Sequence, residues 1–467
     1  MAKIDKKEAE RLESLVPNKK FCPAPFMHTY INSNNRGYKL CCMSHIVGRW
    51  DTEQSLKEQH EEFWTGETMQ NIRQDFLDGK MPESCEWWCG RWEKEGIYHK
   101  SDRLDFIKRY ELELKAGFTE VNWDITHGTL EFQKPVDIDL RPSKMCNLKC
   151  RSCNSLWSDK IEQEVLANPE IQGWSHWDMV TQSPNAMRKA KQIDYSDPKF
   201  DVVSNLDFSN VFRLKMSGGE TLVDPRVYNI MKKLVDSGEA KNVRLHQITN
   251  CTSLPSRIYD LLAQFKEVSF NISVDGVKET DEFLRDGTRW DRKQKVFDKI
   301  FTLPNLKWAG IMHVFQPVSA FQVKRNVEWF LEGYRKYTKQ HNGVTFNPIV
   351  DPWYLSVSWL DEDHKDYIRQ QVKECITEFN MCKQEQQWFD LLHSELDKTQ
   401  TDERRKRYAN DYVRAELALD KIRNTSSLTI EPMLQRYFDR YDPNNVTHGD
   451  KTGRPGAHFD GKPKPTV

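Results

Sequence analysis

The chain has 467 residues, more than one ordinary hydrophobic core fills, so we expect two or three structural units. Hydrophobic residues make up 38% and charged residues 30% of the chain, which excludes a disordered protein, and no stretch approaches the roughly 20 apolar residues of a membrane span. The formal net charge of −1 provides no global basic field, so nucleic acid is not an expected partner. The first residues are charged and lack the apolar middle of a signal peptide, which predicts a cytoplasmic protein with no membrane partner.

The first predicted region covers residues 1–133 and is polar and aromatic. Helices are expected around 51–80 and 97–116. Five cysteines lie in this region: Cys22, Cys41, Cys42, Cys85 and Cys89. Because cytosolic thiols stay reduced, clustered cysteines here are typical of metal or iron–sulfur ligands and not of disulfides.

Residues 134–350 form the second predicted region, in which strand-like and helix-like runs alternate. Val136–Leu140 is strand-like and runs directly into a loop with three cysteines. Further strands are expected at 211–216, 243–248, 268–274, 308–315 and 344–349, and helices from about 155 and at 224–237, 254–264, 291–303 and 322–337. Such alternation requires parallel strands joined by crossovers, so the fold class is α/β. An open six-stranded barrel and a doubly wound sheet both fit, and in either one function gathers at the carboxyl ends of the strands.

Three other segments stand apart from this alternation. Residues 166–205 are expected to be an insertion with its own short helix. Residues 351–443 are predicted to be mainly helical and highly charged, and the charge run at 398–407 indicates a solvated face. Residues 444–467 are rich in Gly, Pro and Lys without periodicity, which predicts a flexible tail.

The loop after the first strand carries Cys146, Cys150 and Cys153. Three thiolates leave one iron of a [4Fe–4S] cluster with an open coordination position, which is what chemistry at the cluster needs. A zinc knuckle would have a second cysteine pair nearby, and none follows within the next ninety residues. A structural zinc site and chance spacing remain the alternatives.

This C-x3-C-x2-C loop resembles the signature of the radical S-adenosylmethionine (radical SAM) superfamily. Gly218, Gly219 and Glu220 end the second predicted strand, as the GGE motif of that family does beside the methionyl amino group of SAM. Two glycines let the backbone approach a ligand, and a carboxylate accepts from an ammonium group. The resemblance implies a partial (β/α)6 TIM-like barrel over residues 134–350.

Three residues at the ends of the third and fourth strands, and one arginine that follows them, extend the resemblance. Asn250 stands in a Thr-Asn-Cys where the family commonly has Thr-Asn-Gly, and Ser273 and Asp275 resemble an S-x-D-G segment that contacts SAM. Arg285 follows at the spacing of a SAM-contacting arginine. A common Ser-Asp-Gly turn and a surface ion pair are the plainer interpretations. The residue before the third cysteine, often aromatic in the family, is Ser152 here.

The resemblance also implies a reaction. SAM bound at the [4Fe–4S] cluster is cleaved reductively to a 5′-deoxyadenosyl radical, which abstracts hydrogen from a substrate, so no side chain is assigned a catalytic role beyond the cluster. A reductant such as flavodoxin or ferredoxin is implied as a partner. The expected substrate is a peptide or protein side chain; tailoring of a nucleotide, sugar or other small metabolite, or a non-catalytic iron–sulfur protein that binds a partner, are the alternatives.

The early cysteines show a second resemblance. Cys22, Gly37 and Cys42 resemble the C-x(9–15)-G-x4-C opening of SPASM and twitch domains, and Cys85 with Cys89 would complete four ligands of an auxiliary [4Fe–4S] cluster. A hairpin with Gly37 at its turn would bring Cys22 and Cys42 together. In those families the auxiliary domain follows the barrel, whereas here the segment precedes it. This arrangement resembles a group of twitch-domain radical SAM proteins, some of them encoded by bacteriophages. Cys41 competes with Cys42, and a zinc site from the same thiols is the alternative.

Overall fold

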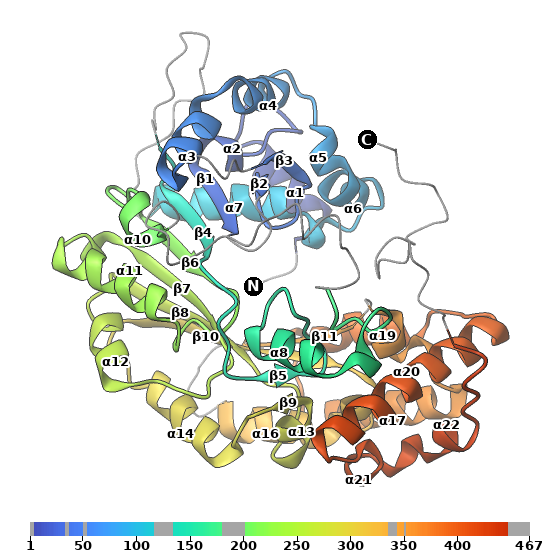
Figure 1. Cartoon of the computed structure of the whole chain (residues 1–467). Helices are drawn as coiled ribbons and strands as arrows, with labels where there is room; N and C mark the ends of the chain where they lie inside the picture. Colours follow the sequence, from blue (N-terminus) through green and yellow to red (C-terminus); the bar gives the residue numbers. More distant parts are fainter. Residues whose placement is uncertain are drawn as a thin grey trace. The chain divides into compact units, whose positions relative to one another are not determined.

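The computed structural model describes residues 4–32, 37–49, 54–115, 134–179, 201–334, 343–349 and 352–446 (Figure 1). Contacts divide the chain into two compact units. The first unit comprises Met1–Ser143, Lys189–Gln247 and Arg257–Ser269, and the second comprises Lys144–Arg188, Ile248–Ser256 and Phe270–Val467. The predicted domain boundaries stay predictions, and most of the predicted tail lies outside the described residues. None of the described helices has the length and apolar character of a membrane span.

The elements of the first unit begin with a helical and hairpin region. Up to residue 115 they are α1 (Lys6–Glu13), α2 (Ala24–Met27), β1 (His28–Asn32), β2 (Gly37–Lys39), β3 (Ile46–Arg49), α3 (Leu56–Thr65), α4 (Glu67–Leu77), α5 (Glu83–Cys85), a π-helical turn (Glu86–Gly90), α6 (Arg91–Lys94) and α7 (Asp102–Lys115). The later ones are β4 (Asp137–Arg141), α10 (Val202–Asn205), β6 (Arg213–Met216), α11 (Pro225–Asp236), β7 (Arg244–Thr249), α12 (Ser256–Leu262) and β8 (Glu267–Ser273). The division between the units passes through β7 and β8.

The sheet of the first unit has the strand order β7-β6-β4-β1-β2-β3. β1, β4, β6 and β7 are parallel to their neighbours, whereas β2 and β3 are antiparallel additions. A hairpin around Gly37 was expected and is present as β1 and β2, but the bounds of these strands and the existence of β3 were not predicted. Their segment is short and rich in Gly, Asn and Arg, so its periodicity is weak, and β1 forms because β4 offers it an open edge.

Local sequence explains where the helices begin. Ser55 caps α3, and Glu58 returns a hydrogen bond to the Ser55 amide in a capping box. Asp224 accepts a hydrogen bond from the Arg226 amide at the start of α11, and Pro225 occupies the first helical position. α11 buries Val227, Ile230, Met231 and Leu234, the predicted apolar face, and lies along one side of β6 and β7 (Figure 1).

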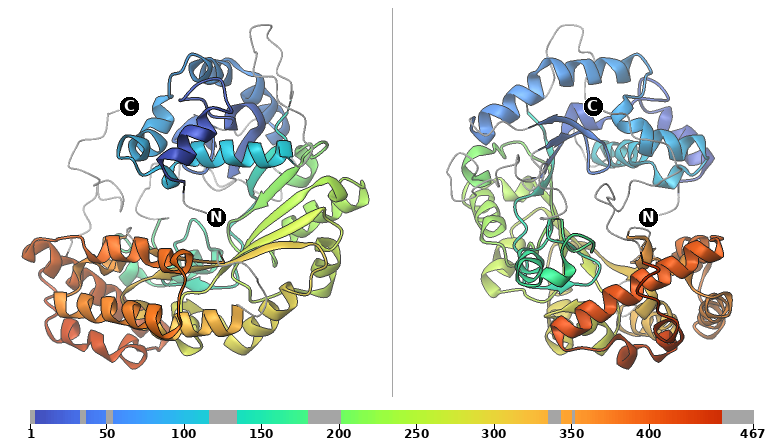
Figure 2. Two further views of the ribbon diagram at one scale, coloured as in Figure 1. Left: turned by 180° about the vertical axis from the view of Figure 1, so that it is seen from behind. Right: turned by 45° about the vertical axis from the view of Figure 1, so that its right-hand side comes forward.

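The second unit contains the cysteine loop and the helical end of the chain. Its elements are β5 (Lys149–Cys150), α8 (Asp159–Ala167), α13 (Glu279–Leu284), β9 (Arg285–Asp286), α14 (Trp290–Ile300), β10 (Leu306–Phe315), α15 (Pro317–Ala320), α16 (Val323–Tyr334), β11 (Val344–Pro348), α17 (Glu362–Glu378), α18 (Lys383–Gln386), α19 (Asp390–Leu396), α20 (Asp402–Arg423), α21 (Ser427–Ile430) and α22 (Gln435–Asp439). Here the strand order is β11-β10-β8, with β10 and β11 parallel. α16 packs on α17, and α20 packs on α22 (Figure 2).

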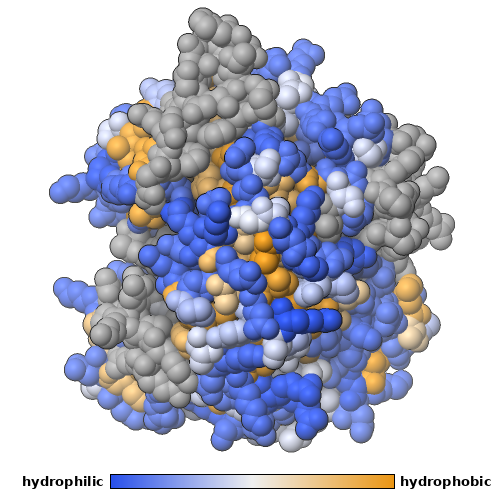
Figure 3. Space-filling model, turned by 90° about the vertical axis from the view of Figure 1, so that its left-hand side faces the viewer, coloured by the Kyte–Doolittle hydropathy of each residue, from blue (hydrophilic) through white to orange (hydrophobic). Residues whose placement is uncertain are grey.

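The predicted α/β class is confirmed. Each of the six predicted strands is present, as β4, β6, β7, β8, β10 and β11, and within each unit these strands keep their chain order. Among the described strands of each unit there is no order reversal of the kind that a doubly wound sheet has, which favours the barrel-like alternative. The predicted insertion contains the short helix α10, while residues 180–200 lie outside the described part. On the face in Figure 3, hydrophilic side chains prevail among the described residues and hydrophobic ones gather in separate areas.

Candidate functional site

The three-cysteine loop lies in the second unit and is shaped by its own backbone. The amide of Cys146 donates to the Asp159 carboxylate at the start of α8, at 2.8 Å, and the amide of Cys153 donates to the Cys150 carbonyl at 3.1 Å. The Cys150 side chain is buried, while Cys146 and Cys153 are half-buried. The backbone therefore turns between Cys150 and Cys153, Cys146 is held at the start of α8, and two of the three thiols are partly open to the surroundings.

A two-stranded ladder places Arg285 directly beside this loop. β5 pairs antiparallel with β9, and Cys150 is the register partner of Arg285. The Arg285 guanidinium donates to the Asp275 carboxylate at 2.7 Å, and Asp275 is fully buried. The Nε of Arg285 is buried and has no hydrogen-bond partner among the described residues. Arg285 thus lies next to Cys150 with its side chain 12% exposed and one donor still to be satisfied, and its ion pair with the buried Asp275 is largely withdrawn from solvent.

The Asp275 carboxylate already accepts hydrogen bonds from other residues of the protein. Besides Arg285, its carboxylate accepts from the Val314 amide at 3.3 Å, and its own amide donates to Asp281 at 2.9 Å. Asp281 in turn pairs with Lys293 at 2.6 Å. Asp275 therefore orients Arg285. Ser273, at the end of β8, is half-buried.

Asn250 reaches the cysteine loop through a side-chain network. Its Nδ2 donates to the Asn147 Oδ1 at 2.9 Å, and Asn147 donates to the Thr252 hydroxyl at 2.8 Å. Asn147 lies between Cys146 and Cys150, so this network fixes the first half of the loop. Cys251 adopts a left-handed conformation with φ +60°, at the position where the resembled motif has glycine.

Gly218, Gly219 and Glu220 belong to the first unit, where they follow β6. Both glycines have positive φ, +85° and +51°. A Cβ on Gly218 would lie 3.2 Å from the Ser143 carbonyl oxygen and 3.3 Å from the Arg141 Cβ, so the close approach requires glycine. The Glu220 carboxylate is buried and accepts from the Leu222 amide at 3.2 Å.

Burial dominates the electrostatics of the loop thiols. It raises the pKa of Cys150, and the neighbouring Arg285 opposes that shift. Burial and the nearby Cys150 raise the pKa of Cys153 to about 12. Because metal ligands of this type are thiolates, binding a cluster here would release protons.

The early cysteines converge on one cavity in the first unit. Four thiol residues line it together with apolar side chains and one arginine; the lining is Cys22, Ala24, Pro25, Leu40, Cys41, Phe76, Met81, Cys85, Cys89, Arg103 and Phe106. The β1–β2 hairpin connects the Cys22 and Cys41 segments, while α5 and the π-helical turn supply Cys85 and Cys89. Gly37 starts β2, and the turn before it lies outside the described residues.

The structure distinguishes Cys41 from its neighbour. Cys41 is buried and lines the cavity, whereas Cys42 is half-buried and is not part of the lining. Charges of Lys215, Asp139 and Arg141 act on the Cys42 thiol, whose pKa is raised mainly by burial. The sequence spacing thus favours Cys42 as a ligand, and the cavity favours Cys41.

An N–H group on the cavity wall donates a hydrogen bond to one of the cysteine sulfurs. The Arg103 amide donates to the Cys89 Sγ at 3.4 Å, and its guanidinium is held by Glu13 and Glu93 at 2.6 and 2.8 Å. N–H donors to ligand sulfur are a usual feature of iron–sulfur sites. Within the described ranges, no three His, Cys, Asp or Glu side chains are grouped closely enough to hold a single metal ion.

Two contacts were beyond sequence reasoning. The β5–β9 pairing joins register partners that are 137 and 135 positions apart, Lys149 with Asp286 and Cys150 with Arg285, and strands of two residues leave no periodic signal. Arg151, between Cys150 and Cys153, is fully buried against α20, although arginine is normally an exposed residue.

Comparisons with known proteins give weak similarities. No family model and no curated protein matches the sequence. The structure of native anSMEcpe with bound AdoMet is 16% identical over 52% of this chain and 62% of its own, with a TM-score of 0.32. Streptococcus suis SuiB bound to precursor peptide SuiA is 15% identical over 80% of this chain and 78% of its own, with a TM-score of 0.33. This chain thus spans about six-tenths of anSMEcpe, and similarity at this level fixes neither family nor function.

Proposed function

We propose that this protein is a radical SAM enzyme that holds one [4Fe–4S] cluster through Cys146, Cys150 and Cys153 and acts on a peptide or protein side chain. The observation that carries the proposal is the pairing of Cys150 with Arg285, whose buried Nε has no partner among the described residues. A cation held beside a three-thiol loop is suited to a cofactor that is both iron-bound and carboxylate-bearing.

The cluster, when bound, supplies a single electron that cleaves SAM. The protein's own residues would position that reaction. Asn250 holds the loop through Asn147, and Asp275 aims the Arg285 guanidinium. In this proposal the buried Glu220 carboxylate, which follows Gly218 and Gly219, is the acceptor for the amino group of SAM.

We propose in addition that Cys22, Cys41, Cys85 and Cys89 hold an auxiliary [4Fe–4S] cluster. Support comes from their shared cavity and from the Arg103 amide that donates to the Cys89 sulfur. The peptide or protein substrate class follows from the SPASM and twitch resemblance of this segment, since such domains mostly accompany those substrates.

Metal and sulfide content tests both sites. The protein is purified and reconstituted without oxygen, and we expect about eight irons per chain, because each cluster contains four. A Cys146/Cys150/Cys153→Ala variant and a Cys85/Cys89→Ser variant should each retain about four irons. Cys382→Ser, a cysteine outside both groups, is the matched control and should keep the full content.

Two outcomes would contradict parts of this proposal. Iron that is unchanged in the Cys146/Cys150/Cys153→Ala variant would exclude those thiols as ligands. One zinc per chain that disappears in the Cys85/Cys89→Ser variant would replace the auxiliary cluster with a zinc site.

A further inference from the structure

Arg151 is a charged residue in an unusual place. It lies between Cys150 and Cys153, and its side chain is completely buried. Its guanidinium donates to Glu416 at 2.7 Å and to Asp420 at 2.6 Å, both on α20, and to the Thr425 hydroxyl at 2.9 Å. These partners follow Arg151 by 265 to 274 positions in the chain. The loop between the two cysteines is therefore tied to the C-terminal helices.

The backbone of Arg151 is held as firmly as its side chain. Its amide donates to the Leu284 carbonyl at 2.8 Å, directly beside the β5–β9 ladder. Its carbonyl accepts from His176 Nε2 and from Trp177 Nε1, both at 2.8 Å. With the guanidinium stacked on the Phe283 ring, 3.7 Å from its centroid, little conformational freedom remains for this residue.

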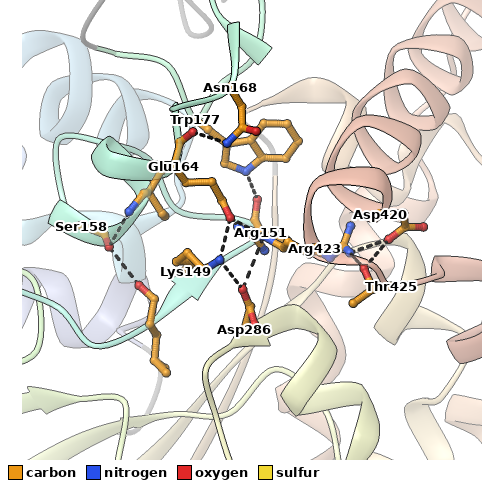
Figure 4. A network of polar contacts seen from close by, with 12 residues as sticks. Lys149, Arg151, Ser158, Glu164, Asn168, Trp177, Asp286, Asp420, Arg423 and Thr425 are labelled. Atoms are coloured by element: carbon orange, nitrogen blue, oxygen red, sulfur yellow. Dashed lines mark hydrogen bonds and ion pairs between the residues drawn. The ribbon is translucent and has the colours of Figure 1, made fainter. Parts of the chain in front are cut away.

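The acceptors on α20 are themselves fixed. Asp420 also accepts from the amide and hydroxyl of Ser427, at 2.7 and 2.9 Å, and from the Thr425 hydroxyl at 2.9 Å. Asn424 closes α20 in a left-handed conformation, which brings Thr425 back toward Asp420. The end of α20 is thus a rigid acceptor site for the Arg151 guanidinium (Figure 4).

A second set of ion pairs also connects the segment around Cys150 to α20. Arg423 of α20 donates to Glu164 of α8 at 2.6 Å, and Glu164 also accepts from Lys149 at 2.7 Å. Lys149 pairs with Asp286 of β9 at 2.8 Å (Figure 4). Residues on both sides of Cys150 are therefore connected to α20.

We propose that Arg151 is a positioning residue that sets the geometry of the Cys150–Cys153 turn through Glu416 and Asp420, which makes α20 a part of the cluster site. A buried ion cluster contributes little net stability compared with apolar packing, but it favours one arrangement of the groups it joins. The role of the loop as a cluster site rests on the proposed function; the anchoring of the loop does not.

The matched pair Glu416→Gln and Glu403→Gln tests this role. Both glutamates lie on α20, but Glu403 is exposed in its first turn. Hydrogen exchange is measured on the full-length protein isolated without oxygen. Glu416→Gln should speed amide exchange over residues 149–153 by roughly tenfold or more, because a charged hydrogen bond is weakened, and Glu403→Gln should leave it unchanged.

A milder and a conservative variant complete the test. Thr425→Val removes one hydrogen-bond acceptor of the Arg151 guanidinium and should give a smaller increase in amide exchange over residues 149–153. If Glu416→Gln does not fold, Thr425→Val tests the proposal in its place. In reconstituted protein, the electron paramagnetic resonance signal of the reduced cluster with SAM should change in Glu416→Gln and Arg151→Met and be partly restored in Arg151→Lys.

Equal exchange of residues 149–153 in folded Glu416→Gln and Glu403→Gln would overturn the proposal, as would unchanged exchange in Thr425→Val if only that variant folds. The exchange result needs no iron. A protein that binds no cluster but shows the expected exchange would therefore contradict the proposed function and leave the anchoring role standing.

Discussion

The backbone conformation of Cys251 is unfavourable, and burial of its side chain offsets that cost. Its φ of +60° is unfavourable for a residue with a Cβ by roughly 1–2 kcal/mol, while its side chain is completely buried. Cys251→Gly should therefore change the free energy of unfolding by less than about 1 kcal/mol, because relief of strain and loss of apolar contact oppose each other. Cys251→Val should lower it by roughly 2–3 kcal/mol, since a β-branched residue avoids this conformation.

Urea unfolding of both variants measures these changes. Equal destabilisation by glycine and valine would show that lost packing, and not backbone conformation, governs this position.

Cys41 and Cys42 offer a sharper test of the auxiliary site. Only Cys41 lines the cavity with Cys22, Cys85 and Cys89. Cys41→Ser should therefore reduce the iron content by about four per chain, and Cys42→Ser should leave it near the wild-type value. If only Cys42→Ser loses iron, then Cys42, which the sequence spacing favours, is the ligand and Cys41 is not.

At the scale of elements, the turn after β8 depends on close packing. A Cβ at Gly276 would lie 2.6 Å from the Thr280 Cγ2 and 3.0 Å from the Asp281 amide nitrogen, so α13 could not keep its place. Gly276→Ala should lower the free energy of unfolding by roughly 1–3 kcal/mol. Gly333→Ala on α16, where the Cβ would lie 3.9 Å from Trp329, should raise it by about 0.5 kcal/mol.

Thermal or urea unfolding compares the two glycine variants directly. A loss of stability in Gly333→Ala as large as that in Gly276→Ala would contradict the packing explanation.

The same elements show what sequence alone predicted. The six alternating strands were predictable because buried apolar runs such as Val268–Val274 give a strong periodic signal. The strand β3 and the β5–β9 ladder were not, because two to four residues carry no period and pairing is set by tertiary contacts. For the site, spacing predicted the three-cysteine loop, but only the fold revealed that Asp275 is bound by Arg285 and that Arg151 is tied to α20.

For the molecule as a whole, buried neutral histidines predict sensitivity to acid. Burial lowers the pKa of His60 in the first unit and of His313 in the second, each to about 4. The unfolded chain takes up these protons below pH 6.5 and the folded chain does not, so stability present above pH 6.5 is lost as the pH falls toward 4. At pH 5 the loss is about 2 kcal/mol for each histidine.

Urea unfolding between pH 7 and pH 4.5 measures this loss, and His60→Gln should make the slope against pH shallower. A slope unchanged by the substitution would show that His60 is not a source of the acid sensitivity.

The most direct test of the central claim is formation of 5′-deoxyadenosine. Reconstituted protein is incubated with SAM and dithionite, with the Cys146/Cys150/Cys153→Ala variant beside it. The proposed function predicts 5′-deoxyadenosine from the wild-type protein and none from the variant. Wild-type protein with a full complement of iron that forms no 5′-deoxyadenosine would contradict the assignment of this chain as a radical SAM enzyme.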